Sequence, residues 1–401
     1  MITFQYKAKN DQGGTTKGIV QAETEGSAAK LLLAQGLTPI DITISQSGNK
    51  LLSRMSSRIS TKDRIIFTRQ LATLLNAGLP LTQSLHTVAE QADSKNLALV
   101  LNDVIITVEG GVALSEALAK HPKVFNDVFI SLVAAGESSG TLDEALERIA
   151  DQQEKDADMI SKVRGALVYP LIVTFVIGAV VIFLLTTVVP QIQLLYKDFN
   201  KELPFLTAIL IGFANILIHY WWLIIIVIVA GGYFLSRWFK TSSGTEVLDR
   251  IKMKVPLFGD LFTKLYMARF SRTGQTLVAS GVQMLEMLRI TARAVDNVHV
   301  ARAIDRAAKK VQGGKALSDS LKDEDVFLPL VPQMLKVGEQ SGSIDKMMGK
   351  SATYYETELD NKIKTISTTI EPILMVVLAI VVGGIVLAIL VPVYGLASES
   401  L

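Results

Sequence analysis

The sequence contains three long runs without a charged residue, and these runs limit the possible folds more than any other feature. They are Val168–Val189, Leu206–Leu235 and Pro372–Val391. A helix rises roughly 1.5 Å per residue, so about 20 apolar residues cover the hydrocarbon core of a bilayer. The composition agrees, because 49% of the residues are hydrophobic and only 19% are charged. The sequence therefore predicts a membrane protein with three transmembrane helices.

The second run is longer than one span requires. The segment "IHYWW", Ile218–Trp222, places aromatic residues inside it. Tyrosine and tryptophan favour the headgroup level of a membrane. We therefore interpret Leu206–Ile218 as mainly interfacial and Trp221–Trp238 as the span.

Basic residues next to the runs predict the orientation. They precede spans one and three and follow span two. Positive residues beside a span indicate its cytoplasmic end. These residues are Lys162, Arg164, Arg237, Lys240, Lys362 and Lys364. The first residues have no apolar stretch typical of a signal peptide. The expected topology is a membrane crossed three times, with the N-terminus in the cytoplasm.

The chain also contains an internal duplication. "FTRQLATLLNAG" at Phe67–Gly78 aligns with "FSRTGQTLVASG" at Phe270–Gly281, an offset of 203 residues. "GESSG" at Gly136–Gly140 aligns with "GEQSG" at Gly338–Gly342, an offset of 202. Pro170 and Pro372 correspond at this second offset. The repeated unit is thus a polar domain together with the span that follows it.

Each unit is predicted to be a helical bundle. Apolar residues recur at helical spacing in both copies, and glycines mark helix ends or positive φ angles. The glycines with this predicted role are Gly78, Gly136, Gly140, Gly281, Gly338 and Gly342. "TLDE" at Thr141–Glu144 is predicted to be a capping box, with Thr141 accepting the first hydrogen bonds of the next helix. Ser343 is the corresponding residue of the second copy.

The N-terminal residues have a different pattern. Two strand-like segments, a short helical segment and a third strand-like segment precede a serine-rich stretch. The predicted fold class is therefore mainly α: a polytopic membrane protein with two duplicated cytoplasmic helical bundles, three transmembrane helices and a small N-terminal α/β module. The predicted domains are the module at 1–45, a linker at 46–61, the first bundle at 62–167, span one at 168–189, a periplasmic or interfacial connection at 190–220, span two at 221–238, the second bundle at 264–369 and span three at 372–393.

Several charged residues recur at equivalent places, and each has a structural and a functional interpretation. Glu137 and Glu339 can satisfy backbone donors at a helix start or bind a partner, and we favour the first. Arg69 and Arg272 can anchor carboxylates or extend to solvent. Glu371 replaces Tyr169 of the first copy and precedes Pro372 at the mouth of span three. An ionisable group there raises a functional hypothesis, although a solvated carboxylate is the simpler explanation.

The sequence offers no catalytic constellation. "GKS" at Gly349–Ser351 resembles the end of a phosphate-binding loop, but Ile344 occupies the position of that motif's first glycine. The four histidines are isolated, and cysteine is absent. A formal charge of +2 gives no broad basic field for nucleic acid. We therefore expect no enzyme, no cofactor and no metal site.

The ordered set of motifs resembles a known family. "FTRQLATLLNAGLPL", the "GESSG" turn, Tyr169-Pro170 leading into a span that ends in "VVPQ", and the duplication are similar to the PilC/GspF-like inner-membrane platform proteins of type IV pilus and type II secretion systems. The resemblance covers almost the whole chain. The substitution of Glu371 for Tyr169 indicates that the two copies differ in their contacts.

The resemblance implies a function and partners. Such a platform couples cytoplasmic hexameric motor ATPases to the insertion of pilin or pseudopilin into a filament or its removal. It also implies contact with other inner-membrane assembly proteins and a homo-oligomeric state, with no nucleic acid. Two other classes remain open at this point. A small secondary transporter requires polar groups at the bilayer midplane, where this sequence has mainly Val, Ile, Leu and Gly. A membrane-tethered enzyme requires catalytic residues in a recognisable arrangement.

Overall fold

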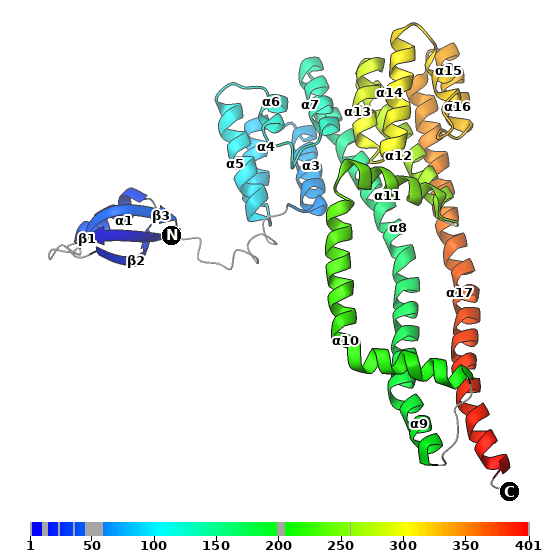
Figure 1. Cartoon of the computed structure of the whole chain (residues 1–401). Coiled ribbons are helices and arrows are strands. Elements are labelled where there is room, and N and C mark those ends of the chain that lie inside the picture. Colours follow the sequence, from blue (N-terminus) through cyan, green and yellow to red (C-terminus); the bar gives the residue numbers. More distant parts are fainter. Residues whose placement is uncertain are drawn as a thin grey trace. The chain divides into compact units, whose positions relative to one another are not determined.

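The structure is a computed structural model that describes residues 2–9, 15–22, 25–34, 37–44, 59–198, 205–256 and 258–399. It divides into two units, Met1–Ser60 and Thr61–Leu401, and each is described by itself. Most of the predicted linker at 46–61 lies outside the described residues. The ribbon is drawn in Figure 1.

The N-terminal unit is a small α/β module, as predicted. Its strands β1 (Ile2–Lys9), β2 (Thr15–Ala22) and β3 (Thr38–Ile44) form an antiparallel sheet in the order β2-β1-β3. The register between β1 and β3 shifts at Lys7 and Ala8. The helix α1 (Glu25–Ala34) contributes the buried Leu32, and β1 contributes the buried Ala8. Both side chains are fully buried, as expected for a small core between a helix and a sheet.

The first bundle begins the second unit. Its helices are α3 (Thr61–Asn76), α4 (Leu81–Glu90), α5 (Lys95–Glu109), α6 (Leu114–Ala119), α7 (Asp127–Ser139) and the first part of α8 (Leu142–Phe183). The ring of Phe125 lies 5.8 Å from that of Phe67 and 5.0 Å from that of Phe129. This aromatic cluster is buried and forms the centre of the bundle.

The second bundle repeats this order. Its helices are α11 (Ser242–Lys254), α12 (Gly259–Ala279), α13 (Met284–Ala294), α14 (Val298–Gln312), α15 (Leu317–Lys322), α16 (Leu330–Ser341) and the first part of α17 (Ile344–Glu399). The ring centres of Phe270 and Phe327 lie 5.0 Å apart, and these residues correspond to Phe67 and Phe125. The bundle extends beyond its predicted start at 264, because α11 packs on α14 through the buried Asp249, which accepts a hydrogen bond from the Val298 amide at 3.0 Å.

Among the described residues, three helices are long and apolar enough to cross a membrane, as predicted. In Figure 1, α8 and α17 leave their bundles side by side and run in the same direction. Near its end α8 passes into a π-helical segment, Leu184–Val188, which is followed by α9 (Val189–Asp198). The apolar side chains of the three membrane-directed helices are largely exposed along the spans, where lipid would cover them.

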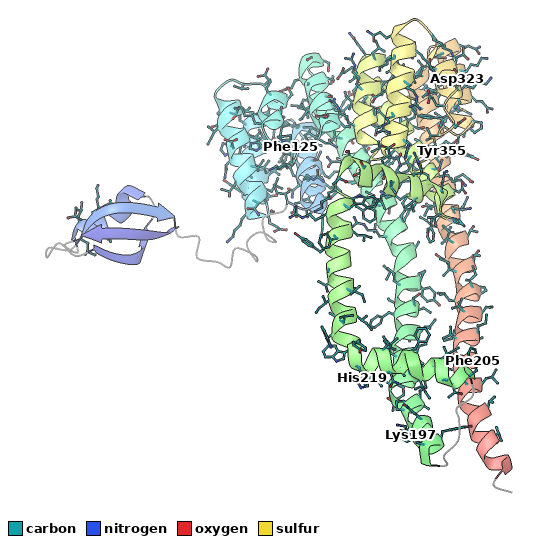
Figure 2. The ribbon with its side chains drawn as sticks, in the orientation of Figure 1. Phe125, Lys197, Phe205, His219, Asp323 and Tyr355 are labelled. Carbon is teal, nitrogen blue, oxygen red and sulfur yellow. The ribbon has the colours of Figure 1, made fainter. Side chains whose placement is uncertain are left out.

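The helix α10 (Phe205–Trp238) is bent. Its backbone leaves helical geometry at Tyr220, with φ −116° and ψ 18°. Figure 2 labels Phe205 and His219 at the two ends of the part before this bend, which runs across the lower parts of α8 and α17. Thr207 there donates a hydrogen bond to the Ala388 carbonyl of α17 at 3.0 Å. The segment predicted to be a connection, 190–220, is therefore helical over its described residues.

Candidate functional site

The repeated glycine-containing turns join each bundle to its long helix. Gly140 follows α7 with φ 75°, and Gly342 follows α16 with φ 66°. The next amide donates back across each turn: Thr141 to the Gly136 carbonyl and Ser343 to the Gly338 carbonyl, both at 2.9 Å. A left-handed residue with this pattern ends a helix and reverses the chain direction. These turns therefore fix where α8 and α17 begin.

Gly136 and Gly338 have a different role from the predicted one. Each lies inside a helix, α7 or α16, and ends neither. A Cβ atom on Gly136 would lie 2.6 Å from the Cβ of Ala145, and one on Gly338 would lie 2.9 Å from the Cα of Ile344. Both glycines are thus required for close packing of α7 on α8 and of α16 on α17.

The predicted capping box at Thr141 is wrong. The Thr141 side chain caps no amide of α8. Its hydroxyl instead forms a 2.7 Å hydrogen bond with the Ser139 hydroxyl, and Ser341 and Ser343 repeat this contact at 2.6 Å. The reason is local: the left-handed Gly140 brings the two hydroxyls together, and Thr141 itself has φ −115° and ψ 45°.

Glu137 and Glu339 cap short helices in their own bundles. Glu137 accepts hydrogen bonds from the Leu114 and Ser115 amides at 2.5 and 3.0 Å and from the Ser115 hydroxyl at 2.5 Å. Glu339 accepts the corresponding bonds from Leu317 and Ser318, at 2.6 and 3.3 Å from the amides and 2.5 Å from the hydroxyl. A carboxylate is favourable at a helix N-terminus. These side chains therefore hold α7 to α6 and α16 to α15.

Arg69 and Arg272 bind carboxylates at equivalent positions. Arg69 donates through Nε and Nη2 to the two oxygens of Glu154, both at 2.8 Å, and Arg272 donates to Glu356 at 2.8 and 2.7 Å. This two-point geometry is the strong form of an arginine–carboxylate pair. The hydrogen bond from Arg69 lowers the pKa of Glu154. The pairs fasten α3 to α8 and α12 to α17.

The remaining predicted residues lie at helix ends or on the long helices. Gly78 and Gly281 follow α3 and α12 with φ 83° and 81°. Tyr169-Pro170 lies within α8, and Glu371-Pro372 lies within α17. The Tyr169 and Glu371 side chains are exposed. Neither proline ends its helix, so each long helix continues from its bundle into the apolar region.

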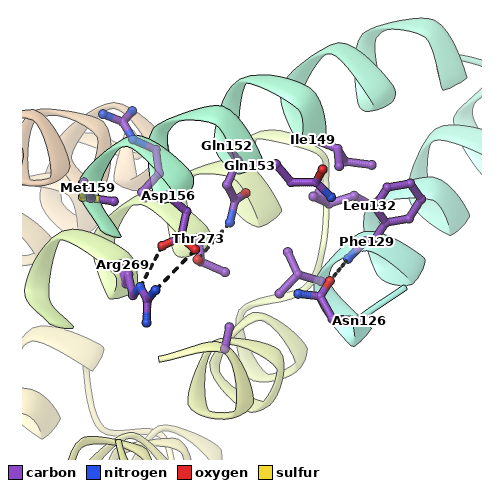
Figure 3. A pocket seen from close by; sticks show the side chains of 13 residues that line it. Asn126, Phe129, Leu132, Ile149, Gln152, Gln153, Asp156, Met159, Arg269 and Thr273 are labelled. Atoms are coloured by element: carbon purple, nitrogen blue, oxygen red, sulfur yellow. Dashed lines mark hydrogen bonds and ion pairs between the residues drawn. The ribbon is translucent and has the colours of Figure 1, made fainter. Parts of the chain in front are cut away.

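The junction between the two bundles contains a small cavity that the sequence did not reveal. Its volume is about 90 Å³. Figure 3 shows Arg269 of α12 reaching Asp156 of α8 and Gln152 of α8 reaching Thr273 of α12. The distances are 2.7 Å for Arg269 Nε to Asp156 Oδ1 and 2.9 Å for Gln152 Nε2 to Thr273 Oγ1. Ile66 stands at the position equivalent to Arg269, so the duplication gave no signal for this contact.

The comparisons with known proteins agree with this duplicated architecture. The model of the family described as "Type II secretion system (T2SS), protein F" matches residues 67–190 and again residues 270–392. The model of its N-terminal domain matches residues 1–43. The chain belongs to the type II secretion system protein F family.

Named members of the family are similar over nearly their whole length. A type IV pilus assembly protein PilC from Thermus thermophilus is 38% identical over 399 residues, which cover 98% of each chain. PilC from Myxococcus xanthus is 35% identical, over 98% of this chain and 95% of that protein. A type II secretion system protein F from Aeromonas hydrophila is 34% identical, over 92% and 97%. The relatives of this protein F family member thus include both pilus assembly proteins and secretion system proteins. These are the two groups that the sequence motifs resemble.

The described residues of this family member give no metal-binding group of three or more His, Cys, Asp or Glu side chains. The "GKS" fragment lies within α17, where Ser351 is buried and bonded to Ser271 at 3.1 Å. A phosphate-binding loop requires its backbone amides to be free of helical hydrogen bonds.

Proposed function

We propose that this chain is an inner-membrane assembly platform of a type IV pilus or a type II secretion machine. The observation that carries the proposal is the similarity to PilC and protein F relatives along nearly the whole chain. The relatives include proteins of both machines, and the proposal covers both. The duplicated bundle-plus-span architecture supports it.

The proposed mechanism uses the continuous helices α8 and α17. Each begins inside a bundle, is clamped there by an arginine–glutamate pair, and continues into the apolar region. A displacement of a bundle by a cytoplasmic motor ATPase therefore moves the span attached to it. We propose that this movement promotes the insertion of pilin or pseudopilin into the filament, or its removal, together with other inner-membrane assembly proteins.

The proposed topology places both bundles and the N-terminal module in the cytoplasm. Basic residues at the bundle ends of all three spans support it. Because the sequence has no cysteine, Ser139→Cys and Ser341→Cys each introduce a single thiol into the glycine turns. Both thiols should be protected from a membrane-impermeant maleimide in intact cells and react after the inner membrane is opened. Labelling of either turn in intact cells would contradict the topology.

The platform role assigns no catalytic step to this chain. We propose that nucleotide hydrolysis belongs to the motor, because Gly349–Ser351 forms part of a helix. ATP turnover by the purified chain that disappears in Lys350→Ala would overturn this part of the proposal.

The experiment that tests the function is deletion of the gene, followed by microscopy for surface filaments and an assay for secreted proteins. The expected result is loss of one of these outputs, restored by the intact gene. A strain that keeps both outputs without the gene would refute the proposal. Copurification of neighbouring envelope components from the complemented strain identifies the machine.

A further inference from the structure

The helix α11 lies where the second span meets the second bundle. The span helix α10 ends at Trp238, and α11 begins at Ser242. The buried Gly244 in the first turn of α11 packs against the end of α10, since a Cβ atom there would collide with the Trp238 carbonyl. Trp238 is exposed, and tryptophan favours the headgroup level of a membrane. Figure 1 shows α11 crossing the bundle end of α10 at a steep angle. The helix α11 is therefore held close to the level at which the span leaves the bilayer.

One face of α11 is fastened to the second bundle. Asp249 accepts a hydrogen bond from the Val298 amide at 3.0 Å. Glu246 pairs with Arg302 at 2.8 Å, and its carbonyl lies 3.1 Å from Nε2 of His299. All three partners belong to the first turns of α14. This face of α11 is therefore turned toward the bundle, and α11 and α14 are held together by polar contacts.

Another face of α11 is apolar and open. Val247, Ile251 and Val255 are 40%, 48% and 37% exposed. Their spacing of four residues places them on one side of the helix, in line with Gly244, which meets the end of α10. We call Val247, Ile251 and Val255 the apolar stripe. The stripe extends the apolar surface of the span onto α11.

Exposed cations border the apolar stripe. They lie at the end of α10, just after it, and on α11, and none forms an ion pair with another described residue: Arg237, Lys240, Arg250 and Lys254. The nearby carboxylates are already paired, Asp249 with Lys252 at 2.9 Å and Glu246 with Arg302. This border thus carries an excess of positive charge. Long basic side chains can rest their stems on apolar groups while their charged ends reach phosphates.

We propose that α11 is an interfacial helix that binds anionic phospholipids of the leaflet next to the bundles. The apolar stripe lies in the boundary between headgroups and acyl chains, and Arg250 and Lys254 contact lipid phosphates. The occupant of this face is the lipid bilayer, because the stripe is continuous with a membrane span and its charged border complements anionic headgroups. This inference goes beyond the platform function and does not depend on it.

A lipid contact at α11 has a mechanical consequence. The helix is joined to α14 through Asp249 and Glu246 and to the span through Gly244. Binding of its other side to lipid holds the second bundle against the membrane surface. The charge of the leaflet then influences how firmly this bundle is held.

Fluorescence quenching tests the lipid contact, because every cysteine must be introduced. Full-length Ile251→Cys is labelled with the dye NBD and reconstituted in vesicles of phosphatidylcholine and phosphatidylglycerol that contain nitroxide-labelled acyl chains. We expect strong quenching of the dye at this position. The matched position is Lys309→Cys, which is exposed and lies roughly 16 Å along α14 from the end that meets α11. The dye there should show little quenching.

The same vesicles test the preference for anionic lipid. At low salt, nitroxide-labelled phosphatidylglycerol should quench the dye at Ile251→Cys several-fold more than an equal fraction of nitroxide-labelled phosphatidylcholine, and high salt should reduce this difference. Arg250→Gln with Lys254→Gln should remove most of the preference and leave the lipid contact. Lys309→Gln with Lys336→Gln removes two exposed cations from other helices of the second bundle and should keep the preference.

Each result decides one part of the proposal. Quenching at Ile251→Cys that does not exceed quenching at Lys309→Cys overturns the lipid contact, whether the dye reports water or a covering protein surface. Equal quenching by the two lipids overturns the anionic preference, and a preference that survives Arg250→Gln with Lys254→Gln overturns the role of these two residues. Thermal unfolding of each variant identifies loss of the fold. Val247→Cys provides a second position on the apolar stripe if Ile251→Cys unfolds.

Discussion

The two bundles join the same two elements with different polar pairs, whose carboxylates lie at opposite ends. In the first bundle, His121 lies 2.7 Å from Asp103 of α5. At the equivalent positions of the second bundle, Glu324 lies 2.5 Å from Arg306 of α14. In both, the second residue after the short helix donates its amide to a carbonyl of that helix, from His121 to Leu118 or from Glu324 to Leu321. The fold therefore accommodates a carboxylate at either end of this pair.

The bundles also differ in how tightly the repeated arginine is enclosed. The Arg69 side chain is 35% exposed, and its partner Glu154 is 44% exposed. The Arg272 side chain is 11% exposed, and Glu356 is 21% exposed. The second bundle thus holds the same two-point pair in a less solvated place, partly because α8 and α12 meet beside it. The following predictions use such equivalent positions to compare the two bundles.

The largest expected effect is loss of a central phenylalanine. Phe67→Ala and Phe270→Ala each leave a cavity beside a second ring, and such truncations cost about 3–5 kcal/mol. Hydrogen exchange of the full-length protein should show loss of protection mainly in the bundle that carries the change. Equal loss of protection in both bundles would show that they unfold together, and it would contradict the view that each bundle has its own core.

The next effect concerns the glycine turns. Gly140→Val and Gly342→Val place a β-branched residue at a positive φ, at a cost of about 1–3 kcal/mol, although a Cβ meets no atom within 4 Å at either position. Because each turn sets the start of a membrane-directed helix, both changes should reduce filament assembly or secretion at unchanged abundance.

The control for the turns is Ser138→Val, since Ser138 is an exposed residue of α7 in the same segment with ordinary helical geometry. Normal assembly by Gly140→Val at normal abundance would exclude transmission through this turn. Loss of both assembly and abundance would assign the glycine to folding.

The parts of this structure that sequence could predict are those governed by local pattern. The three uncharged runs gave the membrane helices, and the duplication gave two bundles, because both depend on periodic or repeated residues. Glu137 and Glu339 were recognisable as residues that satisfy backbone donors, although the short helices that they cap were not predicted. The glycine at 136 was misread because a close approach between helices and a helix end both favour glycine, and only the packing distinguishes them.

Features that depend on one copy alone escaped prediction. Asp156 and Arg269 meet across two bundles, and the repeat alignment places isoleucine opposite the arginine. The helix α11 precedes the aligned part of the second unit, so the repeat gave no signal for it. The capping box failed at Thr141 because its threonine hydroxyl is taken by Ser139, a competition between near neighbours that no spacing rule describes.

A smaller effect is expected when the two-point pairs are broken. Arg272→Met leaves Glu356 in a place with little solvent, and loss of a hydrogen bond to a charged group costs about 1.5–3 kcal/mol. Arg69→Met should cost less, on the order of 1 kcal/mol, because its partners are more exposed and water can replace the guanidinium. Thermal unfolding of the purified protein, with each local effect followed by hydrogen exchange, measures the difference. A larger loss for Arg69→Met would reverse the ranking of the bundles.

The smallest effect distinguishes these two polar pairs by their response to pH. The hydrogen bond from Arg306 lowers the pKa of Glu324 below its usual value, with a further contribution from Lys310. A carboxylate with a lowered folded pKa stabilises the fold fully above its ordinary pKa of about 4.5, and this stabilisation is lost as the pH falls through the lower folded value. Acidification from about pH 5 to about pH 3 should therefore weaken protection around α14 and α15, and Glu324→Gln should remove that part of the pH dependence. The double variant Asp103→Arg with His121→Glu transfers the second bundle's pair into the first, and it should make the region around α5 and α6 lose protection over the same acidic range. An unchanged acid response in Glu324→Gln would show that other carboxylates control the pH dependence of the second bundle. A double variant that fails to fold would show that the first bundle depends on the sign of each charge.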